Sequence, residues 1–222
     1  MKPYPSIYLD RARHRAASDL KGRQADIDAA LKLEPANHDA LVARAEMAAD
    51  AGDFTQAIRT YSHVLAKTPD NLSALVARGI VLARSGDAAA AERDFANARK
   101  RPDITEAANE LCWQKATRGI LLESALKDCT QLLARVPADA SYLDSDGFVL
   151  LRLGRLDEAI AVYNKTLALN PYLPTSLYGR GIAYARKGDE VRAKADLAAA
   201  ERINASVRAD FTRYGVTPPA DR

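Results

Sequence analysis

Hydrophobic residues recur along this chain at steps of three and four residues, which is the spacing of one face of an α-helix. The runs are short, and glycine or proline ends each of them. The run in residues 41–50 is followed by Gly52-Asp53, where glycine can adopt the positive φ of a helix end and aspartate can cap the next helix. A second run over 54–65 stops before Pro69, which has no amide to donate and disfavours helix in the residue before it. The pattern therefore predicts two helices joined by a tight turn.

This hairpin pattern repeats with a strict period of 34 residues. Six blocks of 34 residues fit into the 222-residue chain without insertion or deletion. The blocks cover residues 4–37, 38–71, 72–105, 106–139, 140–173 and 174–207. One alignment column holds an alanine in five successive blocks, at Ala57, Ala91, Ala125, Ala159 and Ala193. Small side chains let paired helices approach closely, so we expect these alanines to be buried where helices cross.

The blocks must stack on one another, because a single hairpin of this kind cannot bury its apolar faces. We therefore expect one all-α domain over residues 1–207. After the last block, Val207, Phe211 and Tyr214 follow at four- and three-residue steps. This spacing predicts that residues 208–222 form a final helix, which caps the exposed end of the stack, followed by a loose tail.

Two of the six blocks depart from the shared pattern. In the first block, Arg11 and Arg23 occupy columns that elsewhere hold alanine or glycine. In the fourth block, Trp113 and Ile120 replace the glycines of the other blocks. We therefore expect the first hairpin to be degenerate and the fourth to be atypical.

Helical hairpins at a strict period of 34 residues resemble the tetratricopeptide repeat family. The fifth block carries the family pattern most completely, at Leu143, Gly147, Leu150, Gly154, Ala159, Tyr163 and Pro171. The resemblance covers residues 38–207 well and the first block poorly. It implies a right-handed α-solenoid, a superhelix of antiparallel helix pairs, in which the first helix of each hairpin lines the concave side. It also implies that a protein or peptide partner binds there.

Composition and charge limit the other classes of partner. The chain has 48% hydrophobic and 27% charged residues, which is typical of a folded globular protein. A formal net charge of +3 is too small to hold a polyanion by itself, so nucleic acid is not the expected partner. The basic run Arg99-Lys100-Arg101 leaves an RNA-binding helical repeat as a remote alternative, but no ladder of aromatic residues accompanies it.

The sequence contains neither a membrane-spanning stretch nor a leader. No run approaches the roughly 18 apolar residues that a membrane-spanning helix needs. The first residues, from Met1 to Pro5, lack the apolar core of a signal peptide. We therefore expect no membrane insertion and a cytoplasmic location for the sequence as given. An exported or periplasmic location stays open if a signal lies outside it.

The sequence shows no set of residues that resembles an active site. His14, His38 and His63 stand alone, without cysteine, histidine or carboxylate partners at a spacing suited to a metal. There is no glycine-rich phosphate loop and no recognisable Ser, His and Asp constellation. We therefore expect a protein that is not an enzyme and that has no metal and no cofactor.

The candidate partner-binding residues lie in three columns of the first helices, where the resemblance places the concave side. One column reads Glu46, Ile80, Gln114, Phe148 and Ile182. A second reads Val42, Val76, Glu110, Asp144 and Tyr178. The third holds four arginines in successive blocks, Arg84, Arg118, Arg152 and Arg186.

The arginine column has two interpretations. The four guanidinium groups could form a ladder for acidic side chains, or for a C-terminal carboxylate, of a bound segment. Alternatively, they are cations placed near helix C-termini, where the helix dipole favours them, and this interpretation has the greater weight. Separately, Arg78 with Asp94 and Arg180 with Asp196, each sixteen residues apart, are predicted to form salt bridges within hairpins.

Cys112 and Cys129 are the only two cysteines, and they fall on the two helices of the fourth hairpin. In the predicted register they are staggered by three residues, or about 4.5 Å along the helix axes. Added to a separation of about 8–10 Å between the axes, this stagger favours two buried free thiols, since a disulfide needs Cα atoms within about 7 Å. A disulfide remains the alternative, and it would fit an exported protein.

Two functional classes follow from these features. The first is a non-catalytic scaffold that binds a partner protein segment in the concave groove. The second is the assembly or structural repeat portion of a larger, bacterial-type protein, for which export stays open.

Overall fold

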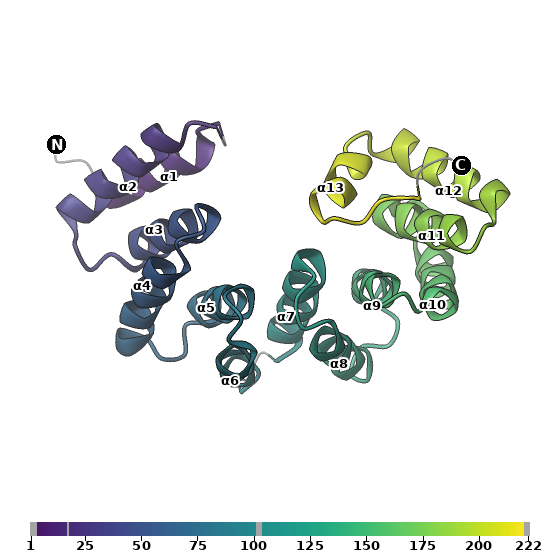
Figure 1. Cartoon of the computed structure of the whole chain (residues 1–222), viewed down its shortest axis with the longest axis horizontal. Helices are drawn as coiled ribbons and strands as arrows, with labels where there is room; N and C mark the ends of the chain where they lie inside the picture. The colour runs from purple at the N-terminus through teal and green to yellow at the C-terminus, as the bar shows by residue number, and fades with distance from the viewer. Residues whose placement is uncertain (1–3, 17, 101–103, 220–222) are drawn as a thin grey trace. The chain divides into compact units, whose positions relative to one another are not determined.

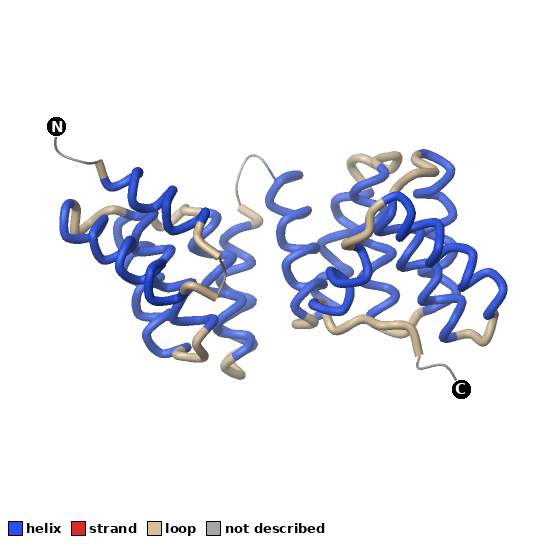
Figure 2. The backbone as a smooth tube through the Cα atoms, turned by 90° about the horizontal axis from the view of Figure 1, so that it is seen from above, coloured by secondary structure: helices blue, strands red, loops and turns tan. Residues whose placement is uncertain are grey.

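The computed structural model describes residues 4–16, 18–100 and 104–219, and within these ranges helices are the only regular secondary structure (Figures 1 and 2). The helices are α1 (Pro5–His14), α2 (Leu20–Leu33), α3 (His38–Asp50), α4 (Phe54–Lys67), α5 (Leu72–Arg84), α6 (Ala88–Ala98), α7 (Ile104–Arg118), α8 (Leu122–Leu133), α9 (Ala140–Arg152), α10 (Leu156–Leu169), α11 (Pro174–Arg186), α12 (Glu190–Ile203) and α13 (Val207–Arg213). Each 34-residue block corresponds to one helix pair, with α7 beginning two residues before its block, so the predicted all-α helical repeat is confirmed.

The helices group into two compact units, Met1–Arg101 with α1–α6 and Pro102–Arg222 with α7–α13. Within each unit, consecutive helices pack on one another, and the first helices of successive hairpins also touch. In the N-terminal unit these first helices are α1, α3 and α5, and in the C-terminal unit they are α7, α9 and α11. A single continuous domain over residues 1–207 stays a prediction.

Helix boundaries follow the local sequence signals closely. Asparagine or aspartate at the N-cap accepts a hydrogen bond from the first turn of most helices, at Asp19, Asn37, Asp53, Asn71, Asp87, Asp139 and Asp189. The turn glycines of four hairpins, Gly52, Gly86, Gly154 and Gly188, have φ between +75° and +98°. Only glycine adopts this conformation without strain, which explains why the turn column holds it.

The cores of the third and fifth hairpins combine a large ring with a glycine that faces it, Phe95 on Gly79 and Tyr163 on Gly147. Phe95 packs on Gly79, where an added Cβ would lie only 2.5 Å from the ring. The five alanines of the shared column are buried, as predicted, at Ala57, Ala91, Ala125, Ala159 and Ala193. Close approach of the helices at these positions depends on the absence of larger side chains.

The tail after α13 is anchored at its start. Val216 is only 2% exposed, and its backbone N–H donates to the Phe211 carbonyl over 2.9 Å. A loose tail was expected from the proline-rich sequence that follows Gly215. Instead, burial of the Val216 side chain against the neighbouring helices holds the backbone at this point.

The structure pairs Cys112 and Cys129 in a disulfide, with their Cα atoms 5.5 Å apart. The preference for two free thiols is therefore wrong. The stagger estimate used the separation of the helix axes, but each Cα lies about 2.3 Å from its own axis. When two residues face each other, the gap between their Cα atoms is shorter than the axis separation by about twice that radius, which leaves room for the bond.

Candidate partner-binding surfaces

The fourteen predicted contact residues all lie on first helices, within two separate units. We call the side formed by the first helices of a unit its first-helix face: α1, α3 and α5 in the N-terminal unit, and α7, α9 and α11 in the C-terminal unit. The structure brings the predicted residues together on these two faces. Their surroundings differ between the units.

In the C-terminal unit, α13 covers the aromatic residues of the predicted groove. Phe148 and Tyr178 are 2% and 1% exposed. The ring of Phe211 in α13 lies 5.4 Å from that of Phe148 and 4.8 Å from that of Tyr178, measured between centroids. Ile182 is fully buried in the same core cluster. These predicted contacts of a partner are thus contacts of the protein's own helix.

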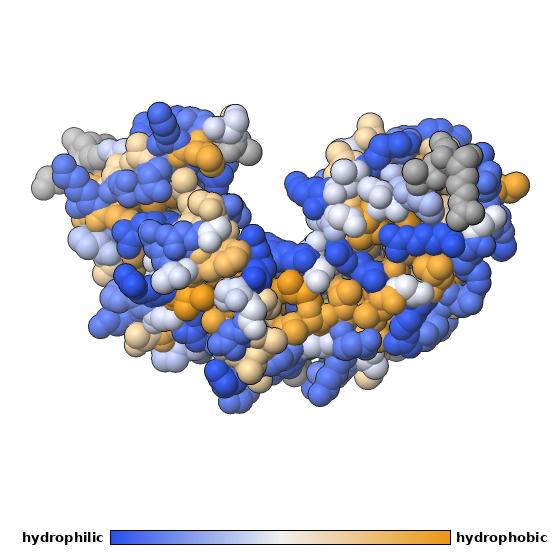
Figure 3. All heavy atoms as spheres, viewed as in Figure 1, coloured by the Kyte–Doolittle hydropathy of each residue, from blue (hydrophilic) through white to orange (hydrophobic). Residues whose placement is uncertain are grey.

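The segment that includes α13 extends beyond the last hairpin. The ring of Tyr214 lies 5.8 Å from that of Trp113 in α7, in an edge-on arrangement. Figure 1 shows α13 beside α11, and in Figure 3 hydrophobic residues gather over α7 to α9. A cap on the last hairpin alone would not reach α7, so this segment connects all three first helices of the unit.

Polar residues of the same columns are engaged within the chain. Asp144 accepts hydrogen bonds from Thr175, over 2.8 Å, and from Ser176. Burial raises the pKa of the Asp144 carboxyl to about 6, although these two hydrogen bonds oppose the shift. Asp144 therefore links α9 to α11 in this structure.

On α7, the predicted contacts form a chain of side chains. Gln114 donates to Glu110 over 2.6 Å, and Arg118 donates to the Gln114 side-chain oxygen. All three are partly or fully exposed. They remain accessible in the C-terminal unit.

Two arginines of the arginine column bind backbone carbonyls of the preceding first helix. Arg152 donates to the Thr117 carbonyl over 3.4 Å, and Arg186 donates to the Leu151 carbonyl over 3.2 Å. Each acceptor lies 35 residues earlier, at the C-terminal end of a helix. Arg152 also donates to the Tyr214 carbonyl after α13. This geometry favours the helix-end interpretation for these two arginines.

The first-helix face of the N-terminal unit keeps charged groups exposed. Glu46 and Arg84 are exposed, and the Arg84 guanidinium lies over the Phe54 ring, 4.9 Å from its centroid. Val42 is half-buried, whereas Val76 and Ile80 are 4% and 6% exposed. The predicted contacts in this unit therefore comprise an apolar base with an acidic and a basic group beside it.

Arginines on two first helices pair with aspartates on the second helix of the same hairpin. Arg78 donates to both carboxylate oxygens of Asp94 over 2.7 Å, and Arg180 donates to those of Asp196 over 2.7 and 2.8 Å. Both predicted salt bridges are confirmed. The hydrogen bonds to each aspartate raise the pKa of its arginine.

The same two arginines also bind the second helix of the preceding hairpin, which the sequence analysis missed. Arg78 donates to Ser62 over 3.0 Å, and Arg180 donates to the Asn164 side chain over 2.8 Å. Each acceptor lies sixteen residues before its arginine, just as the aspartate lies sixteen residues after it. The symmetric spacing is the sequence signal for these contacts.

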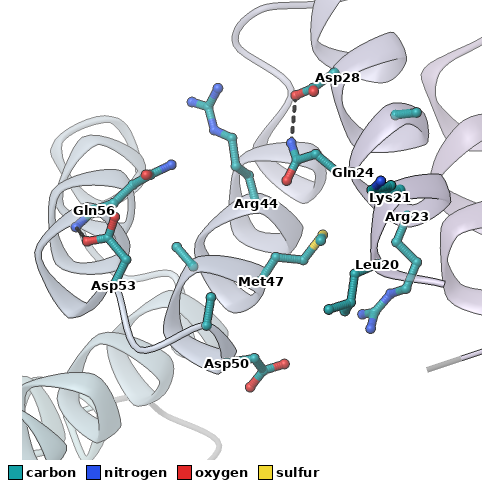
Figure 4. Close-up of a pocket in the computed structure, with 13 residues that line it drawn as sticks. Leu20, Lys21, Arg23, Gln24, Asp28, Arg44, Met47, Asp50, Asp53 and Gln56 are labelled. Carbon is teal, nitrogen blue, oxygen red and sulfur yellow. Dashed lines mark hydrogen bonds between the residues drawn. The ribbon is translucent and has the colours of Figure 1, made fainter. Parts of the chain in front are cut away.

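A groove in the N-terminal unit contains none of the predicted contacts. It has a volume of about 680 Å³ and lies among α2, α3 and α4 (Figure 4). Its lining is Leu20, Lys21, Arg23, Gln24, Ala25, Asp28, Arg44, Met47, Ala48, Asp50, Ala51, Asp53 and Gln56. The Nε of Arg44 is buried there without a hydrogen-bond partner.

The described residues offer no metal cluster: nowhere among them do three histidine, cysteine or carboxylate side chains gather closely enough to hold an ion. Nor is any helix in the described ranges long and apolar enough to cross a membrane.

Models of known families match repeats in both units of the chain. The model described as "Tetratricopeptide repeat" matches residues 13–71 and 48–104, and the model described as "TPR repeat" matches residues 147–188. Together these matches cover more than half of the 222 residues.

Solved structures with the same architecture span nearly the whole chain. A tetratricopeptide repeat protein from Parabacteroides merdae is 17% identical, with a TM-score of 0.60 over 95% of this chain and 92% of that one. PilW, described as a widely conserved type IV pilus biogenesis factor, is 19% identical, with a TM-score of 0.63 over 94% of this chain and 96% of that one. At these identities the likeness concerns the fold alone.

A curated relative matches part of the sequence more strongly. The photosystem I assembly protein Ycf3 of Acaryochloris marina is 34% identical over 95 residues, which is 41% of this chain. The chain covers only 57% of the length of that relative.

Proposed function

This chain belongs to the tetratricopeptide repeat family, and from that premise we propose that it is a non-catalytic scaffold that binds a segment of a partner protein on a first-helix face. The seating of α13 on the first-helix face of the C-terminal unit is the observation that supports this proposal most directly. A short amphipathic helix of the chain itself lies there, and the Phe211 ring contacts the rings of both Phe148 and Tyr178. Binding of an amphipathic helix in a groove through aromatic anchors is a general mode of peptide recognition.

We assign the partner to the first-helix face of the N-terminal unit. Val42 and Ile80 supply apolar surface there, and Glu46 and Arg84 add one charge of each sign. The Arg84 guanidinium is the group that would recognise an acidic side chain or a C-terminal carboxylate, since arginine pairs with carboxylates through two parallel hydrogen bonds. Affinity should then fall as salt concentration rises.

A peptide selected from a random displayed library against the full chain tests this proposal. Arg84→Gln should weaken binding of the selected peptide about tenfold, because a charge-assisted hydrogen bond is lost. Arg186→Gln is the matched control: it lies in the same column but on the C-terminal unit, and it should leave the affinity unchanged. Equal affinities of wild type and Arg84→Gln would refute the assignment.

The likeness to an assembly protein favours a second candidate, in which the chain helps to assemble a multi-subunit complex. This role uses the same scaffold property, and the disulfide between Cys112 and Cys129 is consistent with an oxidising, exported location. Loss of the protein should then lead to unassembled subunits of one complex, seen by native electrophoresis of host extracts. Normal levels of every major complex would count against this candidate.

A further inference from the structure

Two hairpins share a bridging rule for their second helices, and the second hairpin does not follow it. In the third and sixth hairpins, Arg78 and Arg180 each extend between the second helix of their own hairpin and that of the preceding one. The acceptor in the same hairpin is an aspartate, sixteen residues later. Each arginine therefore closes the gap between two second helices with three hydrogen bonds.

Arg44 is the corresponding residue of the second hairpin, and it lacks the carboxylate. The residue sixteen positions later is Thr60, whose hydroxyl donates to the Gln56 carbonyl over 2.9 Å. The residue sixteen positions earlier is Asp28, which accepts a hydrogen bond from Gln24 over 2.9 Å. The buried Nε of Arg44 has no partner. A buried donor without an acceptor is unfavourable, so a carboxylate supplied from outside would bind favourably.

The groove lies at the position where this bridge is missing. Arg44 lines it together with six residues of α2 and with Gln56 of α4, the two second helices that it would otherwise join. Leu20, which is 57% exposed, and Met47 add apolar surface to the same groove (Figure 4). The lining thus includes an arginine without a carboxylate partner among the described residues, and aliphatic side chains elsewhere in the same groove.

We propose that the groove between α2 and α4 is a second binding site, which takes a single acidic side chain of a partner protein with an aliphatic residue beside it. Arg44 binds the carboxylate, and Leu20 and Met47 contact the aliphatic residue. The inference extends the proposed scaffold role to a different face, that of the second helices. It does not depend on Arg84 or on the first-helix face.

The other charges of the groove restrict the occupant to one acid. Lys21 and Arg23 add positive charge, and Asp28, Asp50 and Asp53 add negative charge. With Arg44 included, the two signs balance at three each. A strongly acidic segment would therefore meet repulsion from the aspartates, whereas a segment with one acidic residue among neutral ones would not.

Nuclear magnetic resonance of the full chain labelled with ¹⁵N tests the site. The probes are the peptide acetyl-Leu-Glu-Leu-Ala-amide and its glutamine counterpart, acetyl-Leu-Gln-Leu-Ala-amide. The Arg44 Nε–H signal should shift in a saturable way with the glutamate peptide and at least tenfold more weakly with the glutamine peptide. An Arg44 signal that stays unmoved up to about 10 mM glutamate peptide would overturn the proposal.

Three variants sharpen the result. In Arg44→Gln, which is followed by the backbone amide signals of α2 and α3, the glutamate peptide should cause no shift while the helical circular dichroism is retained. Asp28→Asn should strengthen binding by removing a competing carboxylate. Arg78→Gln, the same substitution one hairpin later, should lower thermal stability and leave peptide affinity unchanged. Undiminished binding by Arg44→Gln, or weaker binding by Asp28→Asn, would contradict the inference. Arg84→Gln, which tests the first-helix face, should not affect this probe, so the two proposals can fail separately.

Discussion

Tyr163 shows how closely single residues are fitted in the C-terminal unit. Its ring fills the space beside Gly147 and Gly179, where added Cβ atoms would lie 2.7 and 2.3 Å from Tyr163 atoms. Its hydroxyl is buried and has no hydrogen-bond partner. Burial also raises the pKa of the phenol well above its ordinary value. The residue therefore combines good packing with an unsatisfied polar group.

Tyr163→Phe should raise the free energy of unfolding by up to about 1 kcal/mol, since it removes the unsatisfied hydroxyl and keeps the ring. The measurement is the midpoint of urea denaturation. Gly179→Ala is the complementary variant and should cost about 1–3 kcal/mol, because its new methyl group meets the tyrosine. A destabilised Tyr163→Phe protein would mean that the hydroxyl has a partner in solution.

Two buried carboxyls should make the protein less stable at neutral than at mildly acidic pH. Burial raises the pKa of Asp144 and of Asp146 to about 6. The folded state holds these protons more tightly than the unfolded state does, so their contribution is full below about pH 4 and is lost as the pH rises through 6. Asp146→Asn should therefore flatten the decrease in unfolding free energy between pH 5 and pH 7, as measured by urea titrations at the two pH values. An unchanged decrease would show that Asp146 titrates normally.

At the scale of elements, the fourth hairpin differs from the others throughout. The Lys115 ammonium donates to Asp128 over 2.9 Å, and both side chains are fully buried. Asp128 is in the column of Asp94 and Asp196, but Cys112 occupies the arginine position of this block. Lysine from the next turn of α7 thus supplies the cation, and the disulfide joins the helices.

The turn of this hairpin contains a strained residue. Leu121, at the N-cap of α8, has φ +46° and ψ +47°, a left-handed conformation that costs a non-glycine residue about 1–2 kcal/mol. Leu121→Gly should therefore raise the thermal midpoint, with a net gain of about 0.5–1 kcal/mol after the entropy cost of glycine. Leu173→Gly is the control, since Leu173 is also an N-cap leucine but has φ −82°. It should give no gain, and equal effects of both substitutions would rule out strain at Leu121.

The disulfide between Cys112 and Cys129 is directly measurable. The unreduced protein, denatured and treated with iodoacetamide, should gain no alkyl groups, and the reduced protein should gain two. Replacing both cysteines by alanine should cost about 2–4 kcal/mol, because the cross-link restricts the unfolded chain. Two alkyl groups on the unreduced protein would restore the free-thiol interpretation and favour a cytoplasmic location.

Local signals in the sequence were sufficient to predict the hairpins, but not what covers them. Helix ends, buried alanines and the Arg78–Asp94 pair depend on spacing within one block, and each was predicted correctly. The seating of Phe211 against Phe148 depends on how the chain turns after α12, which no periodic signal specifies. The groove at Arg44 was overlooked for a different reason. Its signal is a missing aspartate at the Thr60 position, and an absence becomes visible only once the bridging rule is known.

At the scale of the whole molecule, α13 is the element on which the C-terminal unit depends most. It is the shortest of the described helices, yet Val207 and Phe211 are 0% and 2% exposed. Through Tyr214, the segment that follows it extends to Trp113 in the first helix of the unit. The stability of residues 102–222 should therefore depend strongly on a few residues near the C-terminus.

Phe211→Ala should destabilise the C-terminal unit by about 3–5 kcal/mol, the usual cost of a large-to-small change at a buried aromatic site. Trp113 is the only tryptophan, so its fluorescence reports on this unit. In the variant, the midpoint of urea unfolding followed by this fluorescence should shift to a lower urea concentration. Amide hydrogen exchange in α3–α5 should stay unchanged. Equal loss of protection in both units would indicate that they unfold as one.

The hydrogen bonds from Arg152 and Arg186 to main-chain carbonyls affect how a row of repeats can change during evolution. A carbonyl oxygen is present whatever side chain stands at Thr117 or Leu151, so these links survive any substitution of their acceptors. In these two blocks the arginine brings its own connection to the block that precedes it. Blocks could therefore be duplicated or exchanged during evolution without matching changes in their neighbours, and correlated substitutions between adjacent blocks would not reveal this link.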